Sequence, residues 1–587
     1  MKRLAWAALA CALQACSTAP ITPAAGVQGI QVNQVGFLPG SAKWAAVPQT
    51  ASGAFSIVDA NSGRVAHRGT LAPPRRWEPA QEALRLAEFS SFTSPGEYRV
   101  HVDGLPDSPR FAIAPDAYAA LNAAAIRAYT YNRAGIELAP QQAGAWARTA
   151  GHPDTRVLVH ASAAGPGRPE GTVISAPKGW YDAGDYNKYV VNSGITLYTL
   201  LAAYEHFPAF FQQQSLNIPE SGNGIPDVLN EALWNLDWML AMQDPADGGV
   251  YHKLTSPGFD GAVMPHQSTG PRYVVMKTTA ATLDFAAVMA QASRVLAPFE
   301  AQRPGLAARM LVASKAAWAW AKAHPAVVYH QPSDIHTGGY DDDQLGDEFA
   351  WAAAELYVTT RDDTWLSALK LSALPIDVPG WPNVGSLAWI TLAQHRMQLT
   401  PAADRALIER RIVELAAKLA DAWSASPYRV ALQNDDFIWG SNAVALNQAL
   451  MLIQGYRLTG ERRQLDAAQA ALDYVLGRNA TGSSMVTGFG ERSPRHPHHR
   501  PSEADGVDAP VPGFLVGGPY ANQGDTKGCP LPYPSKAPAK SWLDHFCSYT
   551  TNEVAINWNA PLVYASAALQ VLTPGARSAR LSALATR

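Results

Sequence analysis

The sequence predicts two domains of different class, a small all-β sandwich followed by a large all-α domain of paired helices. From residue 28 to about 115, short runs of alternating apolar residues are separated by Pro, Gly, Asn and Ser, which is typical of an antiparallel sandwich. From 116 to about 575, apolar residues recur at helical spacing. Long loops join these segments, which favours a toroid of helices over a small bundle.

The elements of both domains can be placed along the chain. The expected strands include IQVNQVGF (30–37), FSIVDA (55–60) and GEYRVHV (96–102). We expect about twelve helices, and the clearest cover residues 118–132, 226–243, 279–297, 347–360, 401–423 and 442–460.

The chain begins with the pattern of an export signal. Residues 1–15 have a basic start, a short apolar run and then small residues, and the run is too short for a permanent membrane span. The segment Leu13-Gln14-Ala15-Cys16 resembles the bacterial lipobox, which predicts that Cys16 is lipidated after cleavage. Plain secretion is the alternative. Residues 16–27 have linker composition, and residues 576–587 form a tail.

The composition excludes some classes of partner. The chain has 587 residues, 47% of them hydrophobic, and a formal net charge of -3. It therefore offers no basic field for nucleic acid. Its 17 Trp and 21 Tyr supply flat apolar faces of the kind on which sugars stack.

Two cysteines remain in the exported chain besides Cys16. Cys529 and Cys547 flank a proline-rich segment, and in an oxidising compartment they predict one disulfide. Two buried free thiols are the alternative.

Three loop segments join ionisable groups to aromatic residues and glycine: GWYDAGDYNKY (179–189), FGERSPRHPHHRPSEAD (489–505) and WLDHFCSYTTNEVAINWNAP (542–561). The first contains Asp182 and Asp185, and the third contains Glu553 among apolar neighbours. Such neighbours raise the pKa of a carboxyl group and keep a proton available for donation. An ionised pair with a separate protonated carboxyl is the arrangement of glycosidases. A solvated turn and a helix-terminal charge are the alternatives.

The histidine-rich segment allows two interpretations. His496, His498 and His499 are dense enough for a zinc site. The intervening proline and Arg500 favour an extended loop that presents hydrogen-bonding groups to sugar hydroxyls, with His498 and Arg500 on one side.

Together these segments resemble glycoside hydrolase family 9, the inverting cellulases. The resemblance rests on Asp182-Ala183-Gly184-Asp185, on SMVTGFGERSPRHPHHR and on WLDHFCSYTTNEVAINWNA. Residues 439–442 (WGSN) resemble a segment of the family's cleft, and IQVNQVGFLPG resembles the immunoglobulin-like domain that precedes some members. The fold implied is an immunoglobulin-like β-sandwich at 28–115 followed by an (α/α)6-barrel catalytic domain at 116–575.

The resemblance also implies roles for individual residues. Asp185 would be the general base, Asp182 would hold the attacking water with both aspartates ionised, and Glu553 would be the general acid. The expected substrate-binding residues are His498, Arg500, Trp439, Trp558 and Asp544, the last of which would also brace the acid loop. The family often has Tyr at the position of Trp558 and Asn at the position of Tyr520, which puts fine substrate preference in doubt.

Many members of the family bind calcium, and the acidic run at residues 341–348 contains candidate ligands at Asp343, Asp347 and Glu348. Asn383 lies near the position at which relatives can supply a further carboxylate ligand. A helix N-terminus rich in acids is the alternative. We expect no cofactor to be required, with structural calcium as an additional possibility.

The sequence therefore predicts an exported, inverting endo-1,4-β-glucanase that acts on cellulose or related β-glucans. It would be periplasmic, attached to the outer membrane through its lipid anchor, or secreted. One rival is an exo-acting cellobiohydrolase or cellodextrin glucosidase of the same family. The rival from another class is a non-catalytic glucan-binding lipoprotein, which would not require a matched acid and base.

Overall fold

The computed structural model describes residues 29–51 and 53–575. The predicted signal, the lipidation at Cys16, the linker at 16–27 and the tail lie outside these residues and stay predictions. In the described part of the chain, no helix combines the length and the apolar character that a membrane span requires.

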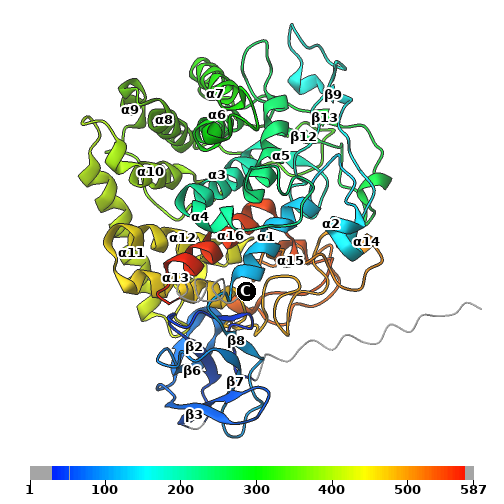
Figure 1. Cartoon of the computed structure of the whole chain (residues 1–587). Coiled ribbons are helices and arrows are strands. Elements are labelled where there is room, and N and C mark those ends of the chain that lie inside the picture. The colour runs from blue at the N-terminus through cyan, green and yellow to red at the C-terminus, as the bar shows by residue number, and fades with distance from the viewer. Residues whose placement is uncertain (1–28, 52, 576–587) are drawn as a thin grey trace, which may run out of the picture.

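The first domain is a sandwich of two sheets (Figure 1). One sheet has the order β1-β8-β7-β3-β4 and the other β2-β6-β5, with every pair antiparallel except β1 and β8. Phe37, Phe89 and Phe111 pack edge-on or tilted in its core, at centroid distances of 5.4–5.6 Å. The strands are β1 (Gly36–Phe37), β2 (Trp44–Pro48), β3 (Ala54–Asp59), β4 (Val65–Thr70), β5 (Arg75–Trp77), β6 (Glu82–Glu88), β7 (Gly96–His101) and β8 (Phe111–Ile113).

The prediction of a strand over residues 30–37 was wrong for most of that run, since only Gly36 and Phe37 form β1. The reason is Asn33, whose Oδ1 accepts hydrogen bonds from the N–H groups of Val35 and Gly36 and so makes a turn. Its Nδ2 donates to Asp473 Oδ1 of the helical domain at 2.9 Å.

The second domain is an (α/α)6 barrel. Six helices that are buried on nearly every side form the inner ring, as their apolar sequences require. Successive members from α16 through α3, α6 and α8 to α10 are in contact, α12 contacts α16, and α11 bridges α10 and α12. The inner helices are α3 (Val190–His206), α6 (Thr279–Leu296), α8 (Gly346–Thr360), α10 (Gly385–Gln394), α12 (Ser441–Thr459) and α16 (Ile556–Leu572).

The outer helices pack against this ring and expose one face. They are α1 (Ala119–Tyr131), α5 (Asp227–Met242), α7 (Leu306–Ala323), α9 (Asp363–Leu369), α11 (Arg405–Ala425) and α13 (Arg462–Val475). Short helices α2 (Pro140–Ala143), α4 (Pro208–Gln212), α14 (Arg500–Ala504) and α15 (Tyr549–Asn552) lie in the connections.

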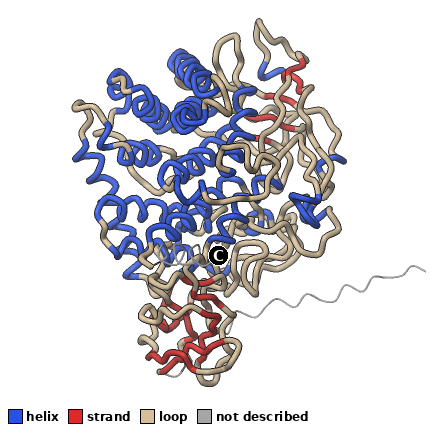
Figure 2. Tube along the Cα trace, in the orientation of Figure 1, coloured by secondary structure: helices blue, strands red, loops and turns tan. Residues whose placement is uncertain are grey.

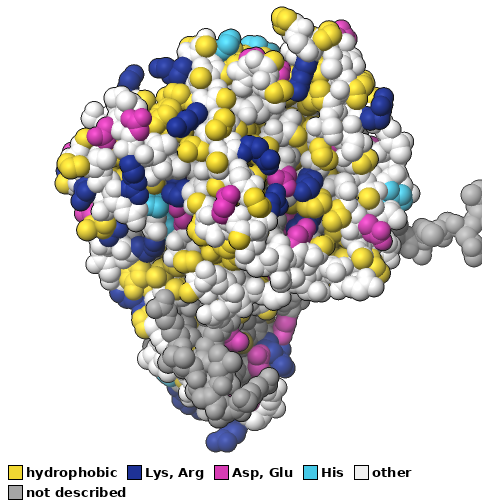
Figure 3. Space-filling view, turned by 45° about the horizontal axis from the view of Figure 1, so that its top comes forward, with side chains coloured by type: hydrophobic (Ala, Val, Ile, Leu, Met, Phe, Trp, Pro, Cys, Tyr) yellow, Lys and Arg dark blue, Asp and Glu magenta, His cyan; other side chains and the backbone are white. Residues whose placement is uncertain are grey.

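Long loops gather on one side of the barrel (Figure 2). Many of them precede the N-termini of inner helices, and a small sheet of order β10-β9-β13-β12-β11 braces them. Its strands are β9 (Val157–Val159), β10 (Val173–Ile174), β11 (Lys188–Tyr189), β12 (Lys253–Thr255) and β13 (Tyr273–Val274). On the face shown in Figure 3, side chains of both charge signs are interspersed, without a continuous basic stripe.

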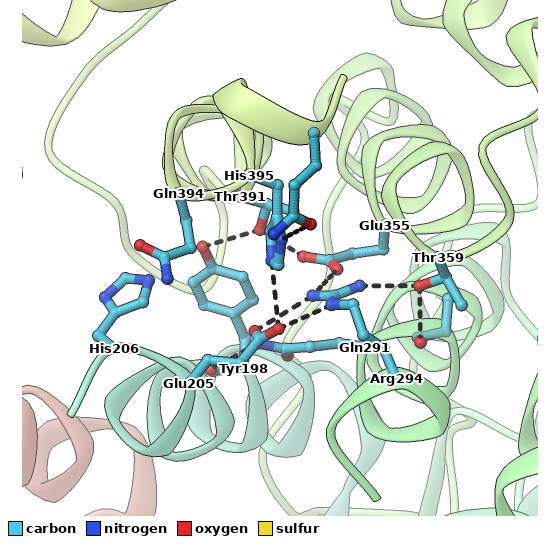
Figure 4. Close-up of polar contacts among 12 residues, drawn as sticks. Tyr198, Glu205, His206, Gln291, Arg294, Glu355, Thr359, Thr391, Gln394 and His395 are labelled. Atoms are coloured by element: carbon cyan, nitrogen blue, oxygen red, sulfur yellow. Dashed lines mark hydrogen bonds and ion pairs between the residues drawn. The ribbon is translucent and has the colours of Figure 1, made fainter. Parts of the chain in front are cut away.

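A buried polar network ties inner helices together away from these loops (Figure 4). Arg294 of α6 contacts Glu205 of α3 at 2.7 Å and Glu355 of α8 at 2.9 Å, and Thr391 of α10 donates to Glu355 at 2.5 Å. Since a buried ion pair adds little net stability, its main effect here is to fix the positions of the four helices.

The sandwich packs against the barrel beside α11 and α13. Trp77 lies 4.6 Å from Tyr428 and 6.0 Å from Phe437 in ring-centroid distance, and Lys540 of a barrel loop pairs with Glu82. Trp77 is 5% exposed, so the junction is a shared apolar core as well as a polar contact.

We expect Trp77→Ala to lower the free energy of unfolding by about 3–5 kcal/mol, because it leaves a cavity between the two domains. Calorimetry of the whole chain would measure this loss. Arg76→Ala, a change at an exposed neighbour, should stay within about 0.5 kcal/mol of the wild type. Equal stability of the two variants would contradict a shared core.

Candidate active site

The loop that carries Asp182 and Asp185 precedes α3 and lies directly against the histidine-rich loop. A Cβ atom on Gly184 would lie 2.1 Å from the carbonyl oxygen of His498, so only glycine fits at this position. Arg500 Nη1 donates to the Gly184 carbonyl at 2.7 Å. The glycine between the two aspartates is therefore what lets the two loops meet.

Asp182 is 1% exposed and held by two donors, with Asn192 Nδ2 and the Tyr340 hydroxyl each 2.6 Å from one carboxyl oxygen. Burial, and then the charge of Asp185, raises the pKa of Asp182 to about 8. The hydrogen bonds from Tyr340 and Asn192 act in the opposite direction and favour the charged form, so the ionisation of both aspartates stays a prediction.

Asp185 has the environment of a general base. Its hydrogen bonds from the described residues all reach Oδ2, from the amides of Asn187 and the Tyr189 hydroxyl, so Oδ1 remains able to accept a proton. Burial raises the pKa of Asp185, while the nearby Arg500 and the Asn187 hydrogen bonds favour its charged form. These partners of Asp185 therefore favour the ionised form that a general base requires.

Glu553 has the environment of a general acid. Its backbone is fixed by a bridge to His498 and by a hydrogen bond from the N–H of Gly517 to its carbonyl at 2.8 Å. Burial, and then the charge of Asp185, raises its pKa well above the usual value. The structure thus brings a carboxyl of raised pKa close to Asp185, while the protonation state of each stays a prediction.

His498 and Arg500 have different surroundings. His498 Nδ1 lies 2.6 Å from the Phe546 carbonyl, its ring stacks on Phe546, and burial lowers its pKa to about 4. The ring is therefore neutral, with a proton on Nδ1 and a lone pair on Nε2. Arg500 is only 6% exposed, and its guanidinium binds the carbonyls of Gly184 and Asp260. Arg500 positions the aspartate loop, and its direct sugar contact stays a prediction.

The two predicted tryptophans also differ. Trp439 is 45% exposed beside Tyr549, as a sugar platform requires. Trp558 is only 9% exposed, because it packs beneath Gly440 and Gly517; a Cβ on Gly440 would lie 2.6 Å from its indole nitrogen. Little of Trp558 is left for contact with a sugar.

Asp544 braces the loops as expected. Its carboxylate accepts from the N–H groups of Arg495 and His496 at 2.8 and 3.0 Å, and from Asn552 Nδ2 at 3.0 Å. It therefore links the histidine loop to the residue before Glu553. Nearby, Cys529 and Cys547 form a disulfide with a Cα–Cα distance of 5.0 Å.

The calcium candidates do not converge. Asp343 is exposed and accepts from Gln344, Asp347 accepts from the N–H of Val384, and Glu348 is fully buried. Asp343 and Asp347 line a cavity of about 1210 Å³ beside α7, α8 and α9. These three carboxyl groups do not form a calcium site by themselves, because their ligand atoms do not meet.

Sequence reasoning missed several residues of the site. Tyr340 reaches Asp182 from 158 positions away, and no local pattern marks that contact. Phe259, 54% exposed with the Arg500 guanidinium 5.7 Å from its ring, offers a second aromatic surface. The one signal in the sequence is that Phe259 belongs to a loop rich in Gly and Pro.

Comparisons with known proteins agree with this geometry. Residues 118–566 match the model of glycosyl hydrolase family 9, and residues 26–107 match that of the cellulase N-terminal ig-like domain. The chain is 42% identical to the xyloglucan-specific endo-beta-1,4-glucanase BoGH9A of Bacteroides ovatus, over 94% of this chain and 96% of that protein. It is 33% identical to a cellulose 1,4-beta-cellobiosidase of Acetivibrio thermocellus, over 93% and 68% of the two chains. A solved structure, Bacteroides ovatus GH9, superposes with a TM-score of 0.87 at 41% identity and covers 93% of this chain and 99% of its own.

We expect Tyr340→Phe to lower kcat roughly ten- to a hundredfold, since a hydrogen bond to a charged or buried group contributes about 1.5–3 kcal/mol. KM should change little, because the hydroxyl acts on Asp182. Tyr456→Phe is the matched control, as the hydroxyl of Tyr456 makes no hydrogen bond to a described residue. Equal kcat values in steady-state assays of the two variants would show that Tyr340 does not support Asp182.

Proposed function

The chain belongs to glycoside hydrolase family 9, and from that membership we propose that it hydrolyses internal β-1,4-glucosidic bonds of β-glucans with inversion at the anomeric carbon. The observation that carries this proposal is the proximity of Asp185 and Glu553, whose loops both meet the backbone of His498. Asp185 is buried and Glu553 is half-buried beside Gly184; Asp185 has an oxygen able to accept a proton, and the pKa of Glu553 is raised. Hydrolysis in this family requires no cofactor.

In the proposed reaction, Asp185 Oδ1 accepts a proton from the attacking water while Asp182 orients that water. Glu553 donates its proton to the glycosidic oxygen that leaves. The C–O bond to the leaving sugar breaks as the water oxygen bonds to the anomeric carbon from the opposite face, which inverts its configuration. Afterwards Asp185 is protonated and Glu553 ionised, and exchange with solvent restores both.

The neighbouring groups suit a sugar chain. His498 Nε2, with its lone pair, is an acceptor for a sugar hydroxyl, and the exposed indole of Trp439 offers a stacking face. A binding protein would need these groups too, but it would not need a carboxyl of raised pKa near a second carboxyl with an oxygen able to accept a proton. This couple favours the enzyme over a non-catalytic glucan-binding lipoprotein.

Endo action and the class of glucan are the finer parts of the proposal. The relative at 42% identity is named a xyloglucan-specific endo-glucanase, and the one at 33% is named a cellobiosidase. We therefore favour internal cleavage of a soluble β-1,4-glucan, xyloglucan included. Export with lipid attachment at Cys16 completes the proposal, on the strength of the first sixteen residues.

Glu553→Gln should abolish cleavage of polymer but spare an aryl glycoside whose leaving group needs no proton. Because the pKa of Glu553 is raised, the wild type should lose activity as pH rises through that pKa. The variant should lack this alkaline limb on the aryl glycoside, which a pH profile of kcat/KM would measure. Asp185→Asn is the control and should be inactive on both substrates. If the pH profile of kcat/KM for Glu553→Gln keeps the alkaline limb of the wild type, Glu553 is not the general acid.

Mode of cleavage can be tested on soluble carboxymethyl cellulose and xyloglucan. Internal cleavage should lower the viscosity steeply for few reducing ends, and proton NMR should show α-anomers first. If reducing sugar accumulates while the viscosity stays nearly constant, the enzyme is exo-acting and the proposal of endo action is wrong. A β-anomer as the first product would overturn inversion, and binding without hydrolysis would favour the glucan-binding alternative.

A further inference from the structure

The segment that leads to Glu553 contains a cluster of metal-ligating atoms outside the catalytic centre. Ligand atoms of Cys529, His545 and Cys547 all lie within 4.8 Å of one another. In the described part of the chain this is the one group of three His, Cys, Asp or Glu side chains that meets so closely. Cys529 is 2% exposed, while His545 and Cys547 are half-buried.

We propose that Cys529, Cys547 and His545 form a binding site for a thiophilic divalent metal ion, such as Zn²⁺, when the disulfide between the two cysteines is reduced. Two thiolates and an imidazole are a ligand set that zinc prefers, and a separation below 5 Å allows all three to reach one tetrahedral ion. This inference does not rest on the proposed hydrolytic function.

The state of His545 suits a metal ligand. Its Nδ1 accepts a hydrogen bond from the N–H of Cys547 at 3.1 Å, so Nδ1 carries a lone pair and Nε2 carries a proton. A metal ion at Nδ1 would replace this hydrogen bond and leave Nε2–H as the outer donor, which is the usual arrangement of a ligating histidine.

A further histidine lies near this group, although its ligand atoms are not among those that meet within 4.8 Å. The ring centroid of His496 lies 6.4 Å from that of His545. The backbone N–H of His496 is held by Asp544, which keeps this exposed side chain beside the cluster. His496 or water would complete the coordination.

The two states are linked by a balanced redox step. A dithiol reductant supplies two electrons and two protons, the S–S bond breaks, and the reductant becomes a disulfide. Metal binding then releases both protons, because the ligands are thiolates. In either state Cys529 and Cys547 remain cross-linked, so the segment before Tyr549 and Glu553 stays tethered under oxidising and reducing conditions.

The experiment uses the full mature chain, reduced with a trialkylphosphine without oxygen and titrated with Co²⁺. Reduced wild type should bind one equivalent and show a thiolate-to-cobalt charge-transfer band that Zn²⁺ abolishes. The oxidised protein and Cys547→Ser should lack the band, and His545→Ala should lose its tetrahedral intensity. His330→Ala, a change at an exposed histidine elsewhere, should match the wild type.

The proposal fails if reduced wild type binds no more cobalt than the Cys529→Ser, Cys547→Ser double variant, or if the oxidised protein binds as much. Circular dichroism must show that the reduced chain is folded. If it is not, protein made without oxidation in a reducing cytoplasm is weighed by native mass spectrometry. Two thiols with one bound zinc support the site, and the metal-free dithiol mass overturns it.

Discussion

The close placement of three carboxyl groups, two buried and one half-buried, at one end of a helical barrel is the constraint on which the rest of the site depends. Asp182, Asp185 and Glu553 repel one another when ionised, and burial makes each charge more costly. The barrel partly offsets this cost, because their loops precede the N-termini of α3 and α16, where the helix macrodipoles are positive. The first N–H of α16 also donates to the Asp182 carbonyl at 2.9 Å. What repulsion remains raises the pKa of Asp182 and of Glu553, for both of which the charge of Asp185 is the second-largest cause after burial.

Backbone contacts bring these groups together more than side chains do. Gly184, His498 and Glu553 are far apart in the sequence, yet the His498 backbone lies against Gly184 on one side and forms a bridge with Glu553 on the other. Arg500 then holds the Gly184 carbonyl from the next turn of the same loop. The distance between base and acid is therefore set by main chain, which is stiffer than side-chain rotamers.

Sequence reasoning identified the two domains, the helical segments and the three carboxyl groups, since each depends on local periodicity or on a short motif. It could not find Tyr340, because its contact with Asp182 exists only once α3 and the loop before α8 are adjacent. It assigned Arg500 and Trp558 to sugar binding and did not foresee that Arg500 binds the Gly184 carbonyl or that Trp558 packs against Gly440. It could not foresee that Asn33 forms a turn and binds Asp473, because the partner belongs to the other domain. The features that could not be predicted are therefore burial by residues far away in the sequence and the hydrogen bonds that such residues make.

The sandwich acts on the catalytic end as well as on stability. Glu82 pairs with Lys540, and the 3₁₀ turns around residues 78–80 and 538–540 pack together, so the sandwich contacts the segment that leads to the acid loop. The disulfide and Asp544 fix the same segment from two further sides. Since four prolines at 530–538 prevent regular structure there, these contacts are what holds it. At the far end of the barrel, Arg294 pairs with Glu205 and Glu355 and fixes three inner helices relative to one another. The loops at the catalytic end are therefore attached to helices whose positions are fixed. Glu553 is therefore positioned from both domains, which gives a physical reason for the sandwich to accompany the barrel in one chain.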